Sequence, residues 1–500
     1  MNFPQVQTNR KTAWPPIYYL VLALVCGLLG CTLYIWLPES LAGRLSVPLI
    51  LGLSLLICGV VFYTGYVRGC LRKPVLFLLC YLALLPWFTW VTKLASALGI
   101  NFPQTVNMVF LLVIPVIALT RRRWFALFKQ VALIRYFSLF LLIVLVNYLF
   151  FDHVVYDKGV AIGKASMSVH YLTPLVLNFF SLYLTAYVVY FTNHPEKLIQ
   201  KLNIVVVTMT LLLSVFALIC YPLNIMTMFI EGMMRMQLIF FHPNNFAIYQ
   251  SYLLLYLLGV YLSHEAAQFS FRWVLIVTLV LGFLALLTTL CKTAIFAVLL
   301  GGALMFLLNC RTINQFKKML FTAISLTFIF GLAGVLLQLS MGVDSVEKIN
   351  DRLNDNRSVE WRQKSWDYLL ENIHGMEVVT GHGMSAAYER MIQHSAMQGH
   401  TDQVAEVHND YLQGLYDFGI IGWILFLGLI ITTFRLIASL FKTQPHPLSR
   451  FLNLTALGLL LIFFISCGTS NCIVMLETPF WILLLTTIEA ARRLNAASVH

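Results

Sequence analysis

A histidine stands at the point where a long polar segment becomes apolar. The stretch AEVHNDYLQGLYDFGIIGW, residues 405–423, turns within ten residues from ionisable and amide groups into a run fit for a bilayer. Ionisable groups are costly to desolvate at the rim of a hydrophobic helix, so His408 is a candidate functional residue. An imidazole that titrates near neutrality suits a general base. The helical spacing of His408, Leu412 and Leu415 predicts that His408 crowns one face of a membrane helix.

A second polar cluster precedes another apolar run. The stretch MMRMQLIFFHPNNFAIYQ carries Arg235, His242 and Asn244. Pro243 lies in the middle of this stretch, so a helix must kink or begin there. A helix that begins there would point free N–H groups and a positive dipole end toward a bound anion. A proline kink satisfied by neighbouring amides explains the same residues equally well.

Two further basic side chains lie at the borders of apolar runs. Lys292, in TTLCKTAIF, separates two such runs, and a cation at a membrane rim is either a snorkelling side chain or a functional group. Arg362 and Trp366 belong to RSVEWRQKSW, whose alternating charge is typical of a solvated helix face. Neither stretch assigns a function without further context, and a lone histidine such as His408 is also more often structural.

The composition is that of a membrane protein. The chain has 500 residues, of which 60% are hydrophobic and only 11% charged. A soluble domain of this size carries about a quarter charged residues. Because backbone polar groups must be satisfied inside lipid, the long apolar runs predict membrane-spanning helices. We therefore expect an all-α, polytopic transmembrane bundle, without a cleavable signal peptide.

Hydropathy predicts 12 to 14 spans. The candidate ranges are 17–37, 47–67, 74–92, 104–119, 131–151, 171–192, 202–222, 237–262, 272–289, 291–308, 319–339, 418–440, 450–470 and 472–490. The pair over 272–308 is joined only by LCKT, which predicts a tight hairpin or a broken helix. Three regions follow: N-terminal spans over 1–339, a large loop over 340–417, and C-terminal spans with a tail over 418–500.

Lysine and arginine are distributed unevenly between the two sides of these spans. One side holds 20 of them, and the short loops of the other side hold six. The positive-inside rule then places both termini in the cytoplasm and the loop over 340–417 on the outer side. The formal net charge of +12 is thus a topology signal rather than a nucleic-acid footprint.

The outer segment 340–417 is far longer than a connection between two helices requires. It holds 13 of the 21 acidic residues and five of the 12 histidines. Connections above about 15 residues are usually functional or disordered. The apolar face of 357–371 predicts a helix, so we expect an ordered, helical cap over the membrane. In the TGHGM stretch that begins at Thr380, two glycines predict a tight turn near the membrane surface.

Cysteine and histidine spacing gives no metal or cofactor site. The ten cysteines are scattered singly, and no CxxC pair occurs. The histidines of segment 340–417 show no i, i+4 pair. We expect neither a metal nor a cofactor.

Four motifs occur in an order that resembles the O-antigen ligase and O-antigen polymerase superfamily of bacterial membrane glycosyltransferases. HPNNFA is similar to the family's HPNxxA element, and CKTA stands where the family has a Ser-Arg-Thr-Ala-like turn. RQKSW followed by GHG is similar to its RxxxW…GxG pattern. HNDYLQGLYDFGIIGW is similar to its HNxxLxxxxxxGxxG pattern. The resemblance covers roughly residues 200–490.

The resemblance implies a metal-independent enzyme of the bacterial inner membrane whose active site faces the periplasm. Its donor is a glycan on undecaprenyl diphosphate, and its acceptor is a hydroxyl of lipid A core or of a second lipid-linked glycan. By this resemblance His408 is the catalytic base, while Lys292 and Arg362 bind the donor diphosphate. We expect Arg235 to be a third cation for the diphosphate. The residues expected to support them are Asn409, His242, Asn244 and Trp366. The expected partners are these glycolipids and membrane lipids, not nucleic acid.

The sequence departs from the family pattern at three positions. Lys292 replaces the usual arginine, which exchanges a planar fork for a point charge. Cys291 replaces the usual serine, and Glu406 stands where some ligases have a second histidine. Glu406 weakens the assignment to ligase over polymerase. Ligase stays the first prediction and polymerase the alternative. A lipid-linked-sugar transporter or a non-catalytic scaffold would be a different class, but the internal repeats typical of transporters are not visible.

Overall fold

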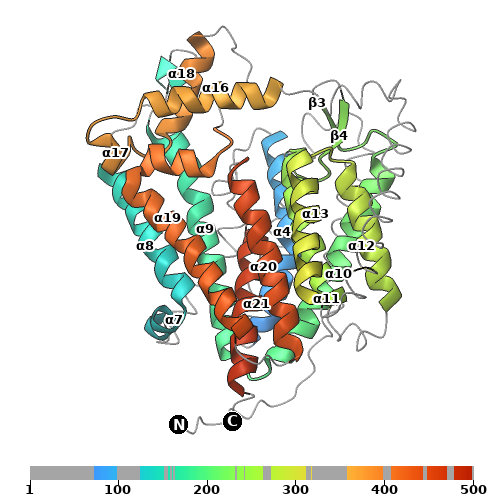
Figure 1. Ribbon diagram of the computed structural model, residues 1–500. Coiled ribbons are helices and arrows are strands. Elements are labelled where there is room, and N and C mark those ends of the chain that lie inside the picture. The colour runs from blue at the N-terminus through green and yellow to red at the C-terminus, as the bar shows by residue number, and fades with distance from the viewer. Residues whose placement is uncertain are drawn as a thin grey trace. The chain divides into compact units, whose positions relative to one another are not determined.

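In the computed structural model the chain divides into two compact units, residues 1–87 and 88–500. The structure describes residues 73–97, 124–150, 156–157, 160–161, 164–230, 233–240, 242–262, 272–310, 317, 357–397, 407–442, 447–469 and 478–497. Helix α4 (Pro74–Ala97) crosses the division between the units. The elements that follow it belong to the second unit (Figure 1).

Apolar helices make up most of the second unit. Within the described residues, six are long and apolar enough to cross a membrane. They are α8 (Ala132–Phe150), α10 (Pro195–Cys220), α11 (Pro243–Leu262), α13 (Lys292–Asn309), α19 (Asp410–Lys442) and α20 (Pro447–Cys467). The others in this part of the chain are α7 (Trp124–Gln130), α9 (Lys164–Phe191), α12 (Arg272–Leu287) and α21 (Thr478–Ala497). The protein is thus an all-α, multi-pass membrane protein.

Each predicted span in the described part of the chain overlaps one of these helices. The predicted spans 17–37, 47–67, 104–119 and 319–339 lie outside the described residues. The chain turns over residues 288–291, and the last two residues of the LCKT link, Lys292 and Thr293, already belong to α13, so α12 and α13 are two separate helices. The span predicted over 237–262 begins six residues later, at Pro243, because proline is favoured at the first turn of a helix.

Helix α11 lies at the centre of the packing because it is apolar on all sides. Its residues are buried from Phe246 to Leu257, where it contacts α10, α12, α13, α20 and α21. A helix that is hydrophobic all round is expected inside a bundle. The outer helices keep one exposed apolar face, as Trp273 of α12 and Phe296 of α13 show. In a membrane these faces meet lipid.

Two short hairpins interrupt the helices, although the sequence predicted no strands. Strands β1 (Tyr156–Asp157) and β2 (Val160–Ala161) pair antiparallel. Strands β3 (Thr227–Ile230) and β4 (Met233–Met236) also pair antiparallel, with Met228 opposite Arg235. The second hairpin matters for function because it carries Arg235.

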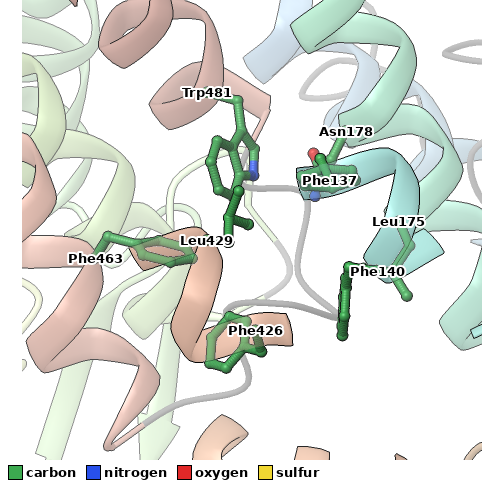
Figure 2. A pocket seen from close by; sticks show the side chains of 8 residues that line it. All are labelled: Phe137, Phe140, Leu175, Asn178, Phe426, Leu429, Phe463 and Trp481. Carbon is green, nitrogen blue, oxygen red and sulfur yellow. The ribbon is translucent and has the colours of Figure 1, made fainter. Parts of the chain in front are cut away.

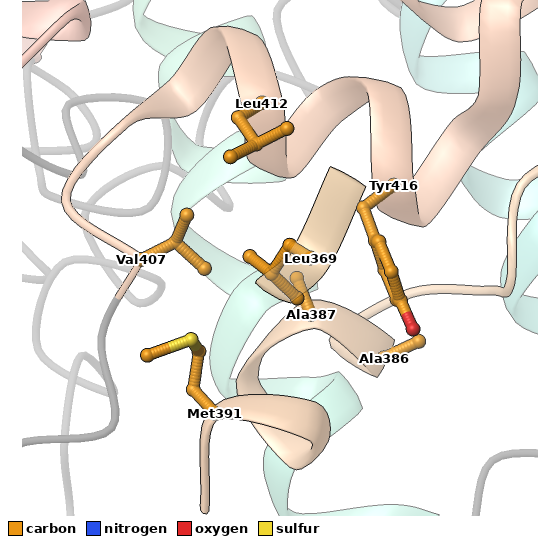
Figure 3. Packing of buried hydrophobic residues seen from close by; sticks show 7 residues of the cluster. All are labelled: Leu369, Ala386, Ala387, Met391, Val407, Leu412 and Tyr416. Atoms are coloured by element: carbon orange, nitrogen blue, oxygen red, sulfur yellow. The ribbon is translucent and has the colours of Figure 1, made fainter. Parts of the chain in front are cut away.

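The cap predicted over 340–417 contains three helices in its described part. They are α16 (Arg357–Glu371), α17 (Glu377–Thr380) and α18 (Ala386–Met397), and Figure 1 shows α16 and α18 beyond the ends of the membrane helices. A small apolar core joins α16 and α18 to the start of α19 (Figure 3). It consists of Leu369, Ala386, Ala387, Met391, Val407, Leu412 and Tyr416. The predicted helix over 357–371 and its buried Leu369 are confirmed.

A break inside α19 connects the cap to the membrane helices. Gly419 has a φ of 63°, and Gly381 of the predicted glycine turn has a φ of 78°. The two backbones are in such close contact that a Cβ on Gly419 would lie 2.3 Å from the Val379 carbonyl oxygen. Only glycine combines this φ with this approach. Residues 410–418 therefore run in a different direction from the apolar stretch that follows.

Candidate active site at the cap end

His408 lies just before α19 rather than on it. The helix begins at Asp410, and His408 has a φ of 52°, a left-handed conformation that costs a non-glycine residue energy. The predicted helical face that His408 would crown is therefore wrong. Asn409 is the N-cap, because its side-chain oxygen accepts the N–H groups of Tyr411 and Leu412, each at 3.1 Å. The conformation of His408 is thus set by the cap and not by helical periodicity.

Helix α16 holds the other side of His408. The indole N–H of Trp366 donates to the carbonyl of Val407 at 2.9 Å. Val407 is buried in the small apolar core, and Trp366 packs against the same core. The backbone is therefore fixed both before His408, by Trp366, and after it, by the Asn409 cap. This anchoring supports the strained φ.

The surroundings of His408 keep its imidazole neutral. Burial lowers its pKa to about 3, and the positive charge of Arg362 and the electrostatic interaction with His242 act in the same direction. Because His408 responds to both side chains, both lie near it. The ordinary pKa of histidine is near 6.5, so at neutral pH this side chain holds a free nitrogen lone pair.

Arg235 ties together three parts of the chain. Its Nε donates to the carbonyl of Thr289 at 2.7 Å, and its Nη2 donates to Oδ1 of Asn244 at 2.7 Å. The side chain is only 5% exposed, which is rare for arginine unless it is well bound. Strand β4, the start of α11 and the turn after α12 are joined by this one guanidinium group.

Helix α11 begins at Pro243, beside His242. Nδ1 of His242 accepts the backbone N–H of Asn244 at 3.1 Å, as an N-cap side chain does. Asn244 in turn accepts from Arg235. Asn244 thus holds the start of α11, a possible anion-binding site, close to Arg235. His242 brings the same helix start near His408.

The turn between α12 and α13 carries Cys291 and Lys292, and it places Cys291 near Arg235 and Arg362. Leu290 has a φ of 52°, and the N–H of Cys291 is held by the hydroxyl of Thr289 at 3.3 Å. Burial raises the pKa of the Cys291 thiol, while Arg235 and Arg362 act against that rise. The thiol is therefore a neutral, buried group between two arginines. Lys292 is the first residue of α13, and its side chain is exposed.

Five separate segments therefore converge at the cap end of the second unit. The charge of Arg362 lowers the pKa of both His408 and Cys291, and the charge of Arg235 lowers that of Cys291. His242 links the start of α11 to His408. The result is a partly buried cationic cluster beside a neutral imidazole. Such a cluster favours the binding of an anion next to a base that a substrate can reach.

A pocket elsewhere in the second unit lacks this chemistry. The pocket in Figure 2 lies among α8, α9, α19, α20 and α21, and aromatic side chains such as Phe137, Phe426 and Trp481 line much of it. Asn178 is the polar residue among its eight lining residues, and it accepts the Thr478 hydroxyl at 2.9 Å. Within the described ranges, no three His, Cys, Asp or Glu side chains gather as metal ligands.

The sequence did not point to the connections that build the cluster. Thr289 was not a candidate, because it contributes a backbone carbonyl. Asp417 was not a candidate either, yet its buried carboxylate accepts the N–H of Ala387 at 2.8 Å and that of Ser385 at 3.3 Å. A carboxylate directly before the predicted membrane span 418–440 was the one signal available for it.

Comparison with known proteins places part of this region in a family. Residues 277–427 match a model of the O-antigen ligase family. The matched range contains Lys292, Arg362 and His408, whereas Arg235 and His242 precede it. No curated protein matches the chain.

Proposed function

We propose that this chain, a membrane glycosyltransferase of the O-antigen ligase and polymerase type, moves a glycan from undecaprenyl diphosphate to a hydroxyl of lipid A core. The family match supports the general class. The observation that carries the proposal is the convergence of Arg235, Arg362 and neutral His408 at one partly buried place. A lipid diphosphate leaving group and a hydroxyl acceptor need this combination of cations and a base.

His408 acts as the general base. Its neutral imidazole takes the proton of the acceptor hydroxyl as that oxygen attacks the anomeric carbon of the donor sugar. A pKa of about 3 makes the free side chain a weak base. A bound diphosphate offsets the positive charge of Arg362, and this raises the pKa of His408 once the donor is present. The base is then strongest when its substrate is in place.

The cations stabilise the leaving group. The bond between the anomeric carbon and the phosphate oxygen breaks, and undecaprenyl diphosphate leaves with the bonding electrons. Arg362 and Lys292 meet the charge that grows on the diphosphate, and Arg235 is oriented by Thr289 and Asn244 for the same task. Charge-assisted hydrogen bonds of this kind are strongest where water is excluded.

The membrane orientation follows from the distribution of basic residues. Arg435, Lys442, Arg492 and Arg493 lie toward the ends of α19 and α21 opposite the cap. The positive-inside rule then makes the cap end periplasmic in a bacterial inner membrane, with both termini cytoplasmic. A lipid-linked donor and a lipid-linked acceptor would meet there at the surface of the bilayer.

The test uses purified protein with an undecaprenyl-diphosphate-linked glycan in EDTA, with lipid A core in one arm and without it in the other. We expect transfer only with core, and loss of transfer in His408→Ala. The matched control is His374→Ala, which removes an exposed histidine of the cap outside the cluster and should retain transfer. Products are separated on a gel.

Other outcomes would change the assignment. A ladder of products without core would make the protein a polymerase, which the replacement of a second histidine by Glu406 also allows. Full activity of His408→Ala would remove His408 as the base. No product in either arm, together with glycan movement across proteoliposomes, would make the protein a transporter.

A further inference from the structure

Three apolar side chains of the cap are exposed near α17. Met376 is 76% exposed, Val378 37% and Val379 39%. They are consecutive except for Glu377, which pairs with Nε2 of His382 at 2.8 Å. Contiguous exposed apolar residues mark an interaction surface rather than an ordinary solvated one. None of them contributes to the cationic cluster around His408.

The depth of this surface in the membrane is fixed by its contacts with α19. The N–H of His382 donates to the Tyr416 carbonyl at 2.9 Å, and the N–H of Gly383 donates to the Asp417 carbonyl at 2.9 Å. Gly381 and Gly419 are in direct backbone contact. Helix α17 therefore lies level with Gly419, where the apolar stretch of α19 begins.

The neighbouring membrane helices present apolar side chains to their surroundings at the same level. Ile420 and Ile421 of α19 are exposed directly after Gly419. Asn147 of α8 donates to the Asp417 carbonyl at 3.3 Å, so the end of α8 also lies there. Leu149, two residues further along α8, is 71% exposed. Figure 1 shows α17 beside the cap ends of α8 and α19.

We propose that α17 and Met376 insert into the membrane at the cap end and anchor the cap to the lipid surface. The occupant of this apolar surface is lipid, because the surface continues the lipid-facing sides of α8 and α19. Glu377, the one acidic residue of the segment 376–380, lies 2.8 Å from Nε2 of His382, which gives its carboxylate a polar contact within the protein. Amphipathic segments of this kind bury their apolar side at the boundary of headgroups and acyl chains.

The anchor sets the height of the cap. Helix α16, with Arg362 and Trp366, is joined to α17 by five residues and shares an apolar core with α18. An anchored α17 thus limits how far α16 can rise from the bilayer. The proposal depends on the membrane location of the helices and does not depend on the reaction.

The test is lipid photolabelling of the unmodified protein in nanodiscs whose lipids carry a diazirine on the acyl chain. Labelled peptides are identified by mass spectrometry. We expect the peptide with residues 376–380 to be labelled as strongly as the peptide with Ile420 and Ile424. It should be labelled severalfold more than the peptide with the exposed polar residues of α16, Gln363 and Lys364.

Two variants and a second probe make the test decisive. Val378→Asp should lower the lipid labelling of this peptide severalfold, whereas Val378→Leu should keep it. Hydroxyl-radical footprinting of the same nanodiscs should leave Met376 protected. Strong radical oxidation without lipid labelling would show a surface in water and overturn the proposal. Protection from both probes would show that protein covers the surface, for example a second copy, and would overturn it as well.

Discussion

The two ends of the second unit use arginine in different ways. At the end opposite the cap, Arg492 donates to the carbonyl of Gln130 at 3.2 Å, and Arg493 donates to the carbonyls of Val189 and Thr192. Arg450 likewise donates to the carbonyl of Leu308, at 3.2 Å. These carbonyls belong to the C-terminal turns of α7, α9 and α13, or lie just beyond them.

At the cap end the arginines face other groups. Arg235 donates to the Thr289 carbonyl and to the side-chain amide of Asn244. Arg235 and Arg362 also interact electrostatically with the thiol of Cys291. Arg362 also faces a neutral histidine. Arginines opposite the cap complement the negative ends of helix dipoles, as expected for structural cations. Arg362 beside a neutral histidine instead fits the substrate-binding role that we propose for it, so the environment distinguishes the two roles although the residue type is the same.

The largest effect is expected from exchanging one arginine at each end. Arg362→Gln should reduce the rate of glycan transfer about 100-fold to 1,000-fold, because a charge aimed at the leaving group is lost. Arg492→Gln should change the rate little, since Arg492 pairs with Glu489 at 3.3 Å with its side chain 42% exposed. Initial rates at equal membrane levels measure both. Equal losses would show that the two ends do not differ as described.

A smaller effect is expected at Lys292, an exposed residue next to Cys291 in the chain. Lys292→Ala should lower the transfer rate about 10-fold to 100-fold, and Lys292→Arg should retain most of it because the charge remains. Lys364→Ala removes an exposed lysine from the helix that carries Arg362 and serves as the control. The same rate assay applies. Wild-type activity in Lys292→Ala would exclude this side chain from the mechanism.

A still smaller effect should follow from loosening the backbone before His408. Trp366→Phe keeps an aromatic ring but removes the hydrogen bond to Val407, worth about 1 kcal/mol, so kcat should fall about fivefold. KM should stay nearly constant, because the indole is placed to position the base rather than the substrate. Trp273→Phe, at a 78% exposed residue of α12, is the control. A rise in KM without a change in kcat would contradict the positioning role.

The smallest expected effect is a change in the pH dependence of kcat/KM. Because the pKa of His408 is lowered by burial and then by Arg362, kcat/KM should not fall as pH drops through the ordinary histidine value of 6.5. Losing the positive charge in Arg362→Gln raises this pKa, so its acid limb should move to higher pH, whereas Arg362→Lys should keep the limb low. Superimposable pH profiles of wild type and Arg362→Gln would show that Arg362 does not act on the base.

Several parts of the fold could be predicted from local patterns. The helix over 357–371 follows from its apolar face, and the start of α11 follows from Pro243. The position of His408 could not be predicted in this way. Its spacing to Leu412 fits a helix, but Asn409 caps the helix after it and Trp366 holds the residue before it. Hydrogen bonds between distant segments have no local sequence signal.

The sequence by itself determined the helical membrane class and the set of chemical groups near the cap. Long apolar runs admit few folds in lipid, because each backbone polar group must find its partner within its own segment. Tertiary structure alone decided that five segments converge, that Arg235 is oriented by Thr289 and Asn244, and that His408 is neutral. Burial and electrostatic interaction depend on distances through space, and residues as far apart as Arg235 and His408 acquire them only when the chain has folded.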